Sequence, residues 1–110
     1  MLPEILAERK TDAGVELELR VPGALACLAG HFPGLPVLPG VVQIDWSVKL
    51  ARTRLALRGQ FAAAENLKFL SIVRPEDRLT LALELVASTR LVFRYFRSDK
   101  KYSFGTLVFT

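Results

Sequence analysis

One histidine and one carboxylate, fourteen positions apart, are the residues of this sequence best suited to moving protons. His31, the only histidine among 110 residues, lies in GHFPGLPVLPG, residues 30–40, where prolines and glycines predict a stiff loop. An imidazole changes its charge near neutral pH, so a histidine held in one orientation can take up or release a proton. Asp45 follows this loop, and partial burial of its carboxyl group would keep a proton available.

Each residue also has an ordinary structural interpretation. Lys49 follows Asp45 by four positions, and on a helix this spacing predicts an ion pair worth roughly 0.2–0.5 kcal/mol. The imidazole of a loop histidine commonly satisfies backbone groups. Taken singly, neither residue decides between catalysis and structure.

The elements that must position these two residues can be predicted from periodicity. One helix is predicted over residues 40–57, with Pro39 and Gly40 at its entry and Gly59 at its exit. Alternating, aromatic or β-branched residues predict strands over 15–21, 79–85, 90–97 and, after a polar turn at 98–101, over 102–110. The stretch 61–73 is more strand-like in its second half, LKFLSIV.

The predicted helix carries two apolar stripes. One consists of Val41, Ile44, Val48, Ala51 and Leu55, and the other of Val42, Trp46, Leu50 and Leu57. A helix with two apolar stripes contacts two surfaces. One would be the protein's own sheet, and the other would be the far edge of that sheet or a second copy of the protein.

Length and composition predict a single globular domain over residues 1–110. Neither a signal peptide nor a membrane span is expected, and the lone Cys27 is expected in the core, so we predict a cytoplasmic protein. The net charge of +4 favours an acidic partner. Since the sequence contains no recognisable nucleic-acid-binding motif, nucleic acid is not the expected partner.

The loop and the start of the helix together resemble a known signature. Residues 31–45, HFPGLPVLPGVVQID, resemble the pattern H-F-x-G-x-P-x-x-P-G, with a carboxylate fourteen residues after the histidine, of the 3-hydroxyacyl-acyl carrier protein dehydratases of the FabA/FabZ group. LKFL and VRPED further along resemble that family's K-F and V-x-P-G-D. The resemblance implies an α+β hot-dog fold, in which a curved antiparallel sheet wraps around one long central helix.

The resemblance also implies an activity and roles for residues. Dehydration of a 3-hydroxyacyl thioester needs a base for the proton beside the carbonyl and an acid for the departing hydroxyl. By resemblance, the base is His31, the acid is Asp45, and the Gly40 amide at the helix N-terminus binds the thioester oxygen. Phe32, Pro39, Gly40 and Val41 would contact substrate, with no metal and no cofactor. In this family the histidine and the carboxylate of one site come from different subunits.

The implied partners are an acyl carrier protein bearing a phosphopantetheine-linked acyl chain and further copies of this chain, as a homodimer or a higher homo-oligomer. Carrier proteins are acidic, so basic residues would steer docking. The candidates form a helix group, Lys49, Arg52, Arg54 and Arg58, and a hairpin group, Arg94, Arg97, Lys100 and Lys101.

Departures from the family pattern keep two alternatives open. Lys49 replaces a usual glutamine and Glu76 replaces the turn glycine, and a cation near Asp45 opposes its role as an acid. The alternatives are a hot-dog thioesterase that uses Asp45, and a non-catalytic acyl-binding module. Gln43-x-Asp45-Trp46 resembles the compact dehydratases of aryl polyene synthesis.

Overall fold

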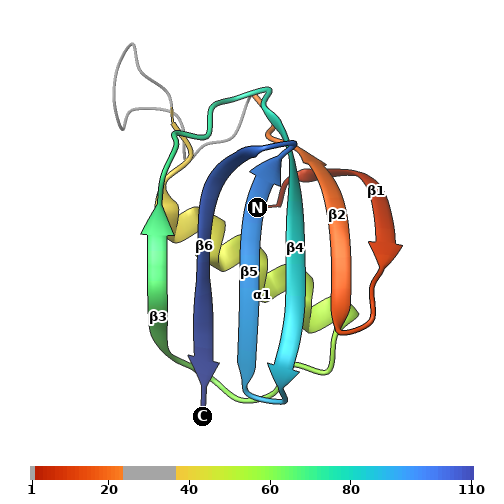
Figure 1. Ribbon diagram of the computed structural model, residues 1–110, viewed down its shortest axis with the longest axis vertical. Coiled ribbons are helices and arrows are strands. Elements are labelled where there is room, and N and C mark those ends of the chain that lie inside the picture. Colours follow the sequence, from red (N-terminus) through yellow and green to blue (C-terminus); the bar gives the residue numbers. More distant parts are fainter. Residues whose placement is uncertain (1, 24–36) are drawn as a thin grey trace.

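A computed structural model describes residues 2–23 and 37–110 as one antiparallel sheet with a helix across one face (Figure 1). Its elements are β1 (Glu4–Lys10), β2 (Gly14–Arg20), α1 (Gly40–Arg54), β3 (Phe61–Phe69), β4 (Arg78–Ala87), β5 (Arg90–Arg97) and β6 (Lys100–Phe109). The strands lie in the order β1-β2-β4-β5-β6-β3, so β1 and β3 form the edges. Within the described residues, no helix has the length and apolar character that crossing a membrane requires.

The main core lies between the inner face of the sheet and α1. The predicted alternation places apolar rows of adjacent strands opposite each other, with Leu17 of β2 paired to Leu81 of β4. The largest fully buried side chains include Trp46 and Leu50 of α1, Leu17 and Leu19 of β2, Leu79, Leu81 and Leu83 of β4, and Leu91, Phe93 and Tyr95 of β5. Burial of these apolar side chains is the main force that holds α1 against the sheet.

The helix begins where predicted and ends earlier. Pro39 is the N-cap and α1 starts at Gly40, but the helix ends at Arg54 rather than at Leu57. Leu55 has an extended backbone, φ −127° and ψ 164°, and its N–H donates to the Ala51 carbonyl. The extended chain then carries the buried side chain of Leu57 into the core. Gly59, the predicted exit, lies in the connection to β3 instead.

Within the single chain only part of the two predicted apolar stripes is buried. Val41, assigned to the first apolar stripe, is 72% exposed. The buried residues of α1 are Gln43, Trp46, Ser47, Leu50 and Ala51. Two polar residues therefore occupy the centre of the buried face, because groups on β5, on β6 and in the chain just before the helix satisfy their hydrogen bonds.

Two strands differ from the sequence prediction. β1 was not predicted, and it forms by pairing with β2 at the edge of the sheet. In 61–73 the strand takes in the alanine-rich first half as well as the first three residues of LKFLSIV, and it ends at Phe69. Pairing with β6 explains this outcome, since Ala63 and Ala64 lie opposite Val108 and Leu107.

Truncation of Leu81 tests the placement of the core. Leu81 is fully buried, so Leu81→Ala should lower the free energy of unfolding by about 2–5 kcal/mol. Val86 lies in the same strand and is 56% exposed, so Val86→Ala should change it by about 0.5 kcal/mol or less. Urea unfolding followed by circular dichroism measures both variants, and equal losses would contradict the described core.

Candidate functional site

The chain on both sides of the histidine loop is bound to the connection between β3 and β4. Val21 donates to the Asp77 carbonyl at 2.9 Å and accepts from the Glu76 N–H at 2.7 Å. On the other side, Leu38 donates to the Val73 carbonyl at 2.7 Å. Two stretches separated by residues 24–36 are therefore fixed to one short segment, residues 73–77.

The structure describes some of the predicted site residues. His31 and Phe32 lie outside the described residues, as does Cys27. Pro39, Gly40, Val41 and Asp45 are described, at or within the first two turns of α1. The predicted meeting of an imidazole with a carboxyl group therefore stays a prediction.

The N-terminus of α1 provides hydrogen-bond donors at Gly40 and Val41. Pro39 is the N-cap and makes no side-chain capping bond, and its carbonyl accepts the N–H groups of Val42 and Gln43. The earliest N–H groups of a helix have no partner within the helix, and the helix dipole makes this end attractive to negative charge. This end of α1 can therefore stabilise a developing oxyanion.

An aromatic ring explains why residue 40 is glycine. A Cβ atom at Gly40 would lie 2.6 Å from Cζ of Phe69 and 2.8 Å from its Cε1. Phe69 is the last residue of β3 and is 45% exposed. The absence of a side chain at residue 40 therefore makes room for the Phe69 ring.

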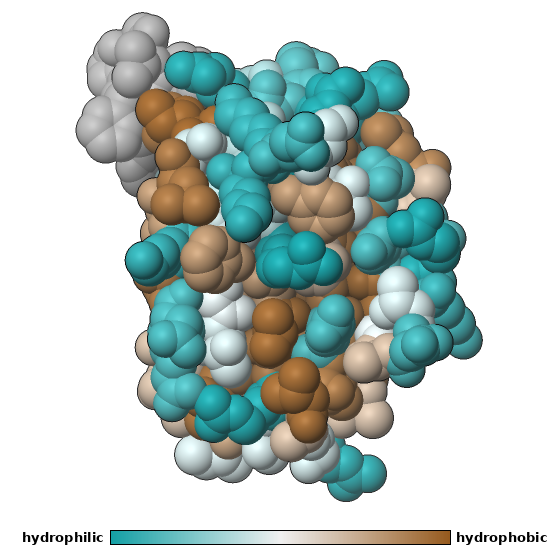
Figure 2. All heavy atoms as spheres, in the orientation of Figure 1, coloured by the Kyte–Doolittle hydropathy of each residue, from teal (hydrophilic) through white to brown (hydrophobic). Residues whose placement is uncertain are grey.

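An apolar cavity of about 420 Å³ opens beside this helix end. Its lining consists of Val37, Leu38, Pro39, Gly40, Gln43, Phe69, Leu70, Ser71, Ile72 and Val73. Phe69, Leu70 and Ile72 are large apolar residues that remain exposed here, and Figure 2 shows apolar side chains gathered beside the grey segment. A cavity of this size and character suits a small apolar group or an acyl chain.

Asp45 lies outside this cavity and is paired with Lys49. The Asp45 Oδ2 to Lys49 Nζ distance is 2.9 Å, and both side chains are about half exposed. The ion-pair interpretation is therefore confirmed, and within a single chain the Asp45 side chain is only half buried. The carboxylate points to the exposed side of α1.

Comparison with known proteins identifies the family. Residues 7–106 match the family model of the ApeI dehydratases. The chain belongs to the ApeI-like dehydratase family. This finding confirms the resemblance inferred from residues 31–45.

Solved structures agree with this assignment. The ApeI-like chain matches the ApeI:P dehydratase heterocomplex from Xenorhabdus doucetiae with a TM-score of 0.88 and 32% identity, over 98% of this chain and 97% of that one. An uncharacterised protein from Erwinia carotovora subsp. atroseptica matches with a TM-score of 0.82 and 36% identity, over 100% and 97% of the two chains. These matches confirm the predicted hot-dog fold.

Curated relatives are longer. The 3-hydroxyacyl-acyl-carrier-protein dehydratase FabZ of Pediococcus pentosaceus is 38% identical over 68 residues, which cover 56% of this chain and 46% of that relative. The ApeI-like chain thus spans about half the length of the curated relatives it matches.

A buried polar network behind the cavity was missed by sequence reasoning. Gln43 and Ser47 of α1 meet Tyr95 of β5 and Ser103 of β6, and all four residues are buried. Burial raises the pKa of the Tyr95 phenol, the nearby Asp45 charge adds to this effect, and the phenol keeps its proton. The feature of the sequence that could have revealed this network was the i,i+4 spacing of Gln43 and Ser47 between the two apolar stripes.

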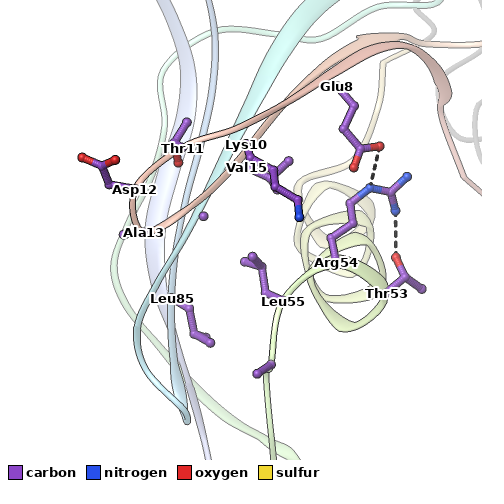
Figure 3. A pocket seen from close by; sticks show the side chains of 12 residues that line it. Glu8, Lys10, Thr11, Asp12, Ala13, Val15, Thr53, Arg54, Leu55 and Leu85 are labelled. Carbon is purple, nitrogen blue, oxygen red and sulfur yellow. Dashed lines mark hydrogen bonds and ion pairs between the residues drawn. The ribbon is translucent and has the colours of Figure 1, made fainter.

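A larger cavity, of about 650 Å³, lies at the other end of the helix. It is formed by the β1–β2 hairpin and the C-terminal end of α1 (Figure 3). Arg54 there donates to Glu8 at 3.1 Å and to Thr53 at 2.7 Å. Of the predicted site residues that the structure describes, none lines this cavity, so we place the candidate site of the ApeI-like dehydratase at the N-terminal end of α1.

Steric coupling between residues 40 and 69 can be measured. Gly40→Ala should reduce the free energy of unfolding by about 1 kcal/mol, because the clash with Phe69 exceeds the gain in helix propensity. In a Phe69→Ala background the same change should be neutral or stabilising by about 0.5 kcal/mol. A double-mutant cycle on urea unfolding gives the coupling, and additive effects would show that the ring does not restrict residue 40.

Proposed function

We propose that this ApeI-like dehydratase converts 3-hydroxyacyl thioesters on acyl carrier protein to trans-2-enoyl thioesters, in fatty acid or aryl-polyene-like biosynthesis. The observation that carries the proposal is an apolar cavity that opens beside the helix N-terminus in a chain of a dehydratase family. The cavity can receive acyl carbons, and the N–H of Gly40 can bind the thioester oxygen. The matched ApeI structure and the sequence Gln43-x-Asp45-Trp46 support the aryl-polyene branch.

The reaction requires two proton transfers. The His31 imidazole removes the proton from the carbon beside the thioester carbonyl. Negative charge then grows on the thioester oxygen, where the Gly40 N–H stabilises it. The bond from the third carbon to its hydroxyl breaks, Asp45 donates its proton to that oxygen, and water departs as the double bond forms. Proton exchange with water returns both groups to their starting state.

We assign the His31 and the Asp45 of one site to different subunits of a homodimer. Asp45 lies on the exposed side of α1, whereas Gln43, which lines the cavity, faces inward. The edge strand β3 is exposed along almost its whole length, and Phe61 and Phe69 are among its exposed residues. An exposed edge strand presents unpaired backbone groups that a second chain can pair with. These features support a second copy of the chain as the subunit whose Asp45 acts together with His31 in one site.

The Asp45–Lys49 pair favours a second candidate function. This pair engages a carboxylate, whereas the dehydratase step uses a carboxylic acid. A hot-dog thioesterase would use the carboxylate to attack the thioester or to position water. A non-catalytic acyl-binding module would use neither group.

Replacement of the two assigned groups tests the reaction. His31→Ala and Asp45→Asn should each reduce the rate of enoyl thioester formation roughly 100-fold or more, since general acid–base groups contribute about that much. The assay follows the absorbance of the conjugated product from a short 3-hydroxyacyl thioester. Asp12→Asn, in the distant β1–β2 turn, is the matched control and should retain full activity.

The products separate the candidate functions. Release of free thiol without enoyl product would favour the thioesterase, and tight binding without turnover would favour the binding module. Full activity of His31→Ala with an unchanged melting temperature would refute the dehydratase mechanism. Sedimentation of the purified chain tests the homodimer, since a monomer, or dimerisation only with a related chain, would contradict it.

The two predicted basic groups differ in their distance from the cavity. β5 ends at Arg97 and β6 begins at Lys100, at the same end of the sheet where β3 ends (Figure 1). The cavity-lining residues Leu70 and Ser71 both donate to the Tyr102 carbonyl, next to Lys101. In the helix group, by contrast, Arg54 is bonded to Glu8 and Arg52 to the Gly59 carbonyl. We therefore propose that the hairpin group receives the carrier protein.

Charge reversal tests this docking proposal. Lys101→Glu should raise KM for the carrier-bound substrate roughly five- to tenfold at low salt, because it reverses one steering charge. Neither kcat nor the KM for a small thioester should change, and the difference should shrink at high salt. Lys10→Glu at the end of β1, beside the distant cavity, is the control. Equal effects of the two variants would contradict docking at the hairpin.

A further inference from the structure

Gln43 connects three parts of the chain from inside the core. The residue is 3% exposed. Its Nε2 donates to the Leu38 carbonyl at 3.3 Å, and its Oε1 accepts from Ser103 Oγ of β6 at 2.7 Å. Because both ends of the side-chain amide are engaged, the amide has one defined orientation.

The backbone carbonyl of Gln43 is held as well. Tyr95 Oη of β5 donates to it at 2.7 Å, and Ser47 Oγ lies 2.9 Å from it and 3.2 Å from Tyr95 Oη. The Tyr95 bond to this carbonyl and the Ser103 bond to the side-chain amide fix the first turns of α1 to β5 and β6. Gln43 therefore has a fixed position relative to the sheet. From this position its side chain can hold the peptide that precedes the helix.

The group that Gln43 holds is the peptide before the helix. Leu38 is buried, its N–H donates to the Val73 carbonyl, and its carbonyl accepts from Gln43. Pro39 follows with φ −61°, an angle that its ring fixes. Since Leu38 is bonded on both sides and Pro39 is stiff, few rotations remain that could redirect the Gly40 N–H.

The two bonds of the Gln43 amide differ in what could replace them. Apolar groups in place of both Gln43 and Ser103 would cost little stability through that bond, but the Leu38 carbonyl is a backbone group that no substitution removes. The particular property of an amide at this position is its ability to hold Leu38 and Ser103 together. The amide therefore satisfies the Leu38 carbonyl and also fixes where that carbonyl lies.

We propose that Gln43 is a positioning residue that holds the Leu38 carbonyl and thereby aims the Gly40 N–H into the apolar cavity. This proposal rests on the proposed function, in which that N–H binds the thioester oxygen. Gln43 acts through Leu38 and Pro39 and does not itself react.

The experiment compares Gln43→Met with Ser47→Ala in the full chain. Gln43→Met keeps the length of the side chain and loses the bond to Leu38, so kcat should fall roughly 10- to 100-fold, as expected for misplaced groups, while KM changes less than about twofold. Ser47→Ala removes a buried hydroxyl of the same helix face that does not contact Leu38, and its kcat should stay within about twofold. The double variant Gln43→Met with Ser103→Ala should regain part of the melting temperature lost in Gln43→Met, because the Ser103 hydroxyl is no longer left unpaired, but it should not regain kcat.

Hydrogen exchange gives a readout that does not depend on turnover. The Leu38 amide, bonded to Val73, should exchange roughly tenfold faster in Gln43→Met than in the unmodified protein or in Ser47→Ala. Unchanged exchange at Leu38, or a kcat that recovers with stability in the double variant, would overturn the positioning role. If the unmodified protein forms no enoyl product, the proposed function fails, and the exchange rates still decide whether Gln43 holds Leu38.

Discussion

The backbone hydrogen bonds made by the segment 73–77 are the constraint on which the candidate site depends. Val73 receives the N–H of Leu38, while Glu76 and Asp77 bond to Val21. A connection between two strands therefore sets where β2 ends and where the approach to α1 begins. Because the connection also contributes Val73 to the apolar cavity, one element shapes the cavity and anchors the chain around it.

Charges on the surface reinforce this anchor. Arg20, at the end of β2, forms ion pairs with Glu4 of β1 and with Glu76. The hydrogen bond from Arg20, and then its charge, lower the pKa of the Glu4 carboxyl. Glu76 has φ 71°, in the left-handed region where the related family carries glycine. The ion pair offsets part of the strain that a non-glycine residue has there, although an exposed pair contributes only about 0–1 kcal/mol.

Local sequence patterns predicted those elements whose own residues favour the structure that they adopt. β5 occupies Arg90–Arg97 as predicted because its residues favour strands and a polar turn follows it, and Pro39 with Gly40 marked the start of α1. The same patterns failed where burial or strand formation depends on contacts with residues far away in the sequence. Gln43 is buried because Ser103 and Tyr95 satisfy it from 60 and 52 positions away, and the alanines of β3 form a strand because β6 pairs with them. For the site, Gly40 and the helix N-terminus were found from the motif, whereas Phe69 and the polar network depend on contacts that periodicity cannot reveal.

The burial of Trp46 has a practical consequence. It is the only tryptophan of the sequence, it follows Asp45 directly on α1, and it is fully buried in the core. Indole fluorescence responds to the polarity around the ring, so the intrinsic emission of this protein reports on one place, the contact between helix and sheet. Loosening of that contact would shift the emission toward longer wavelength, and the protein therefore contains its own optical probe beside the carboxylate assigned to the chemistry.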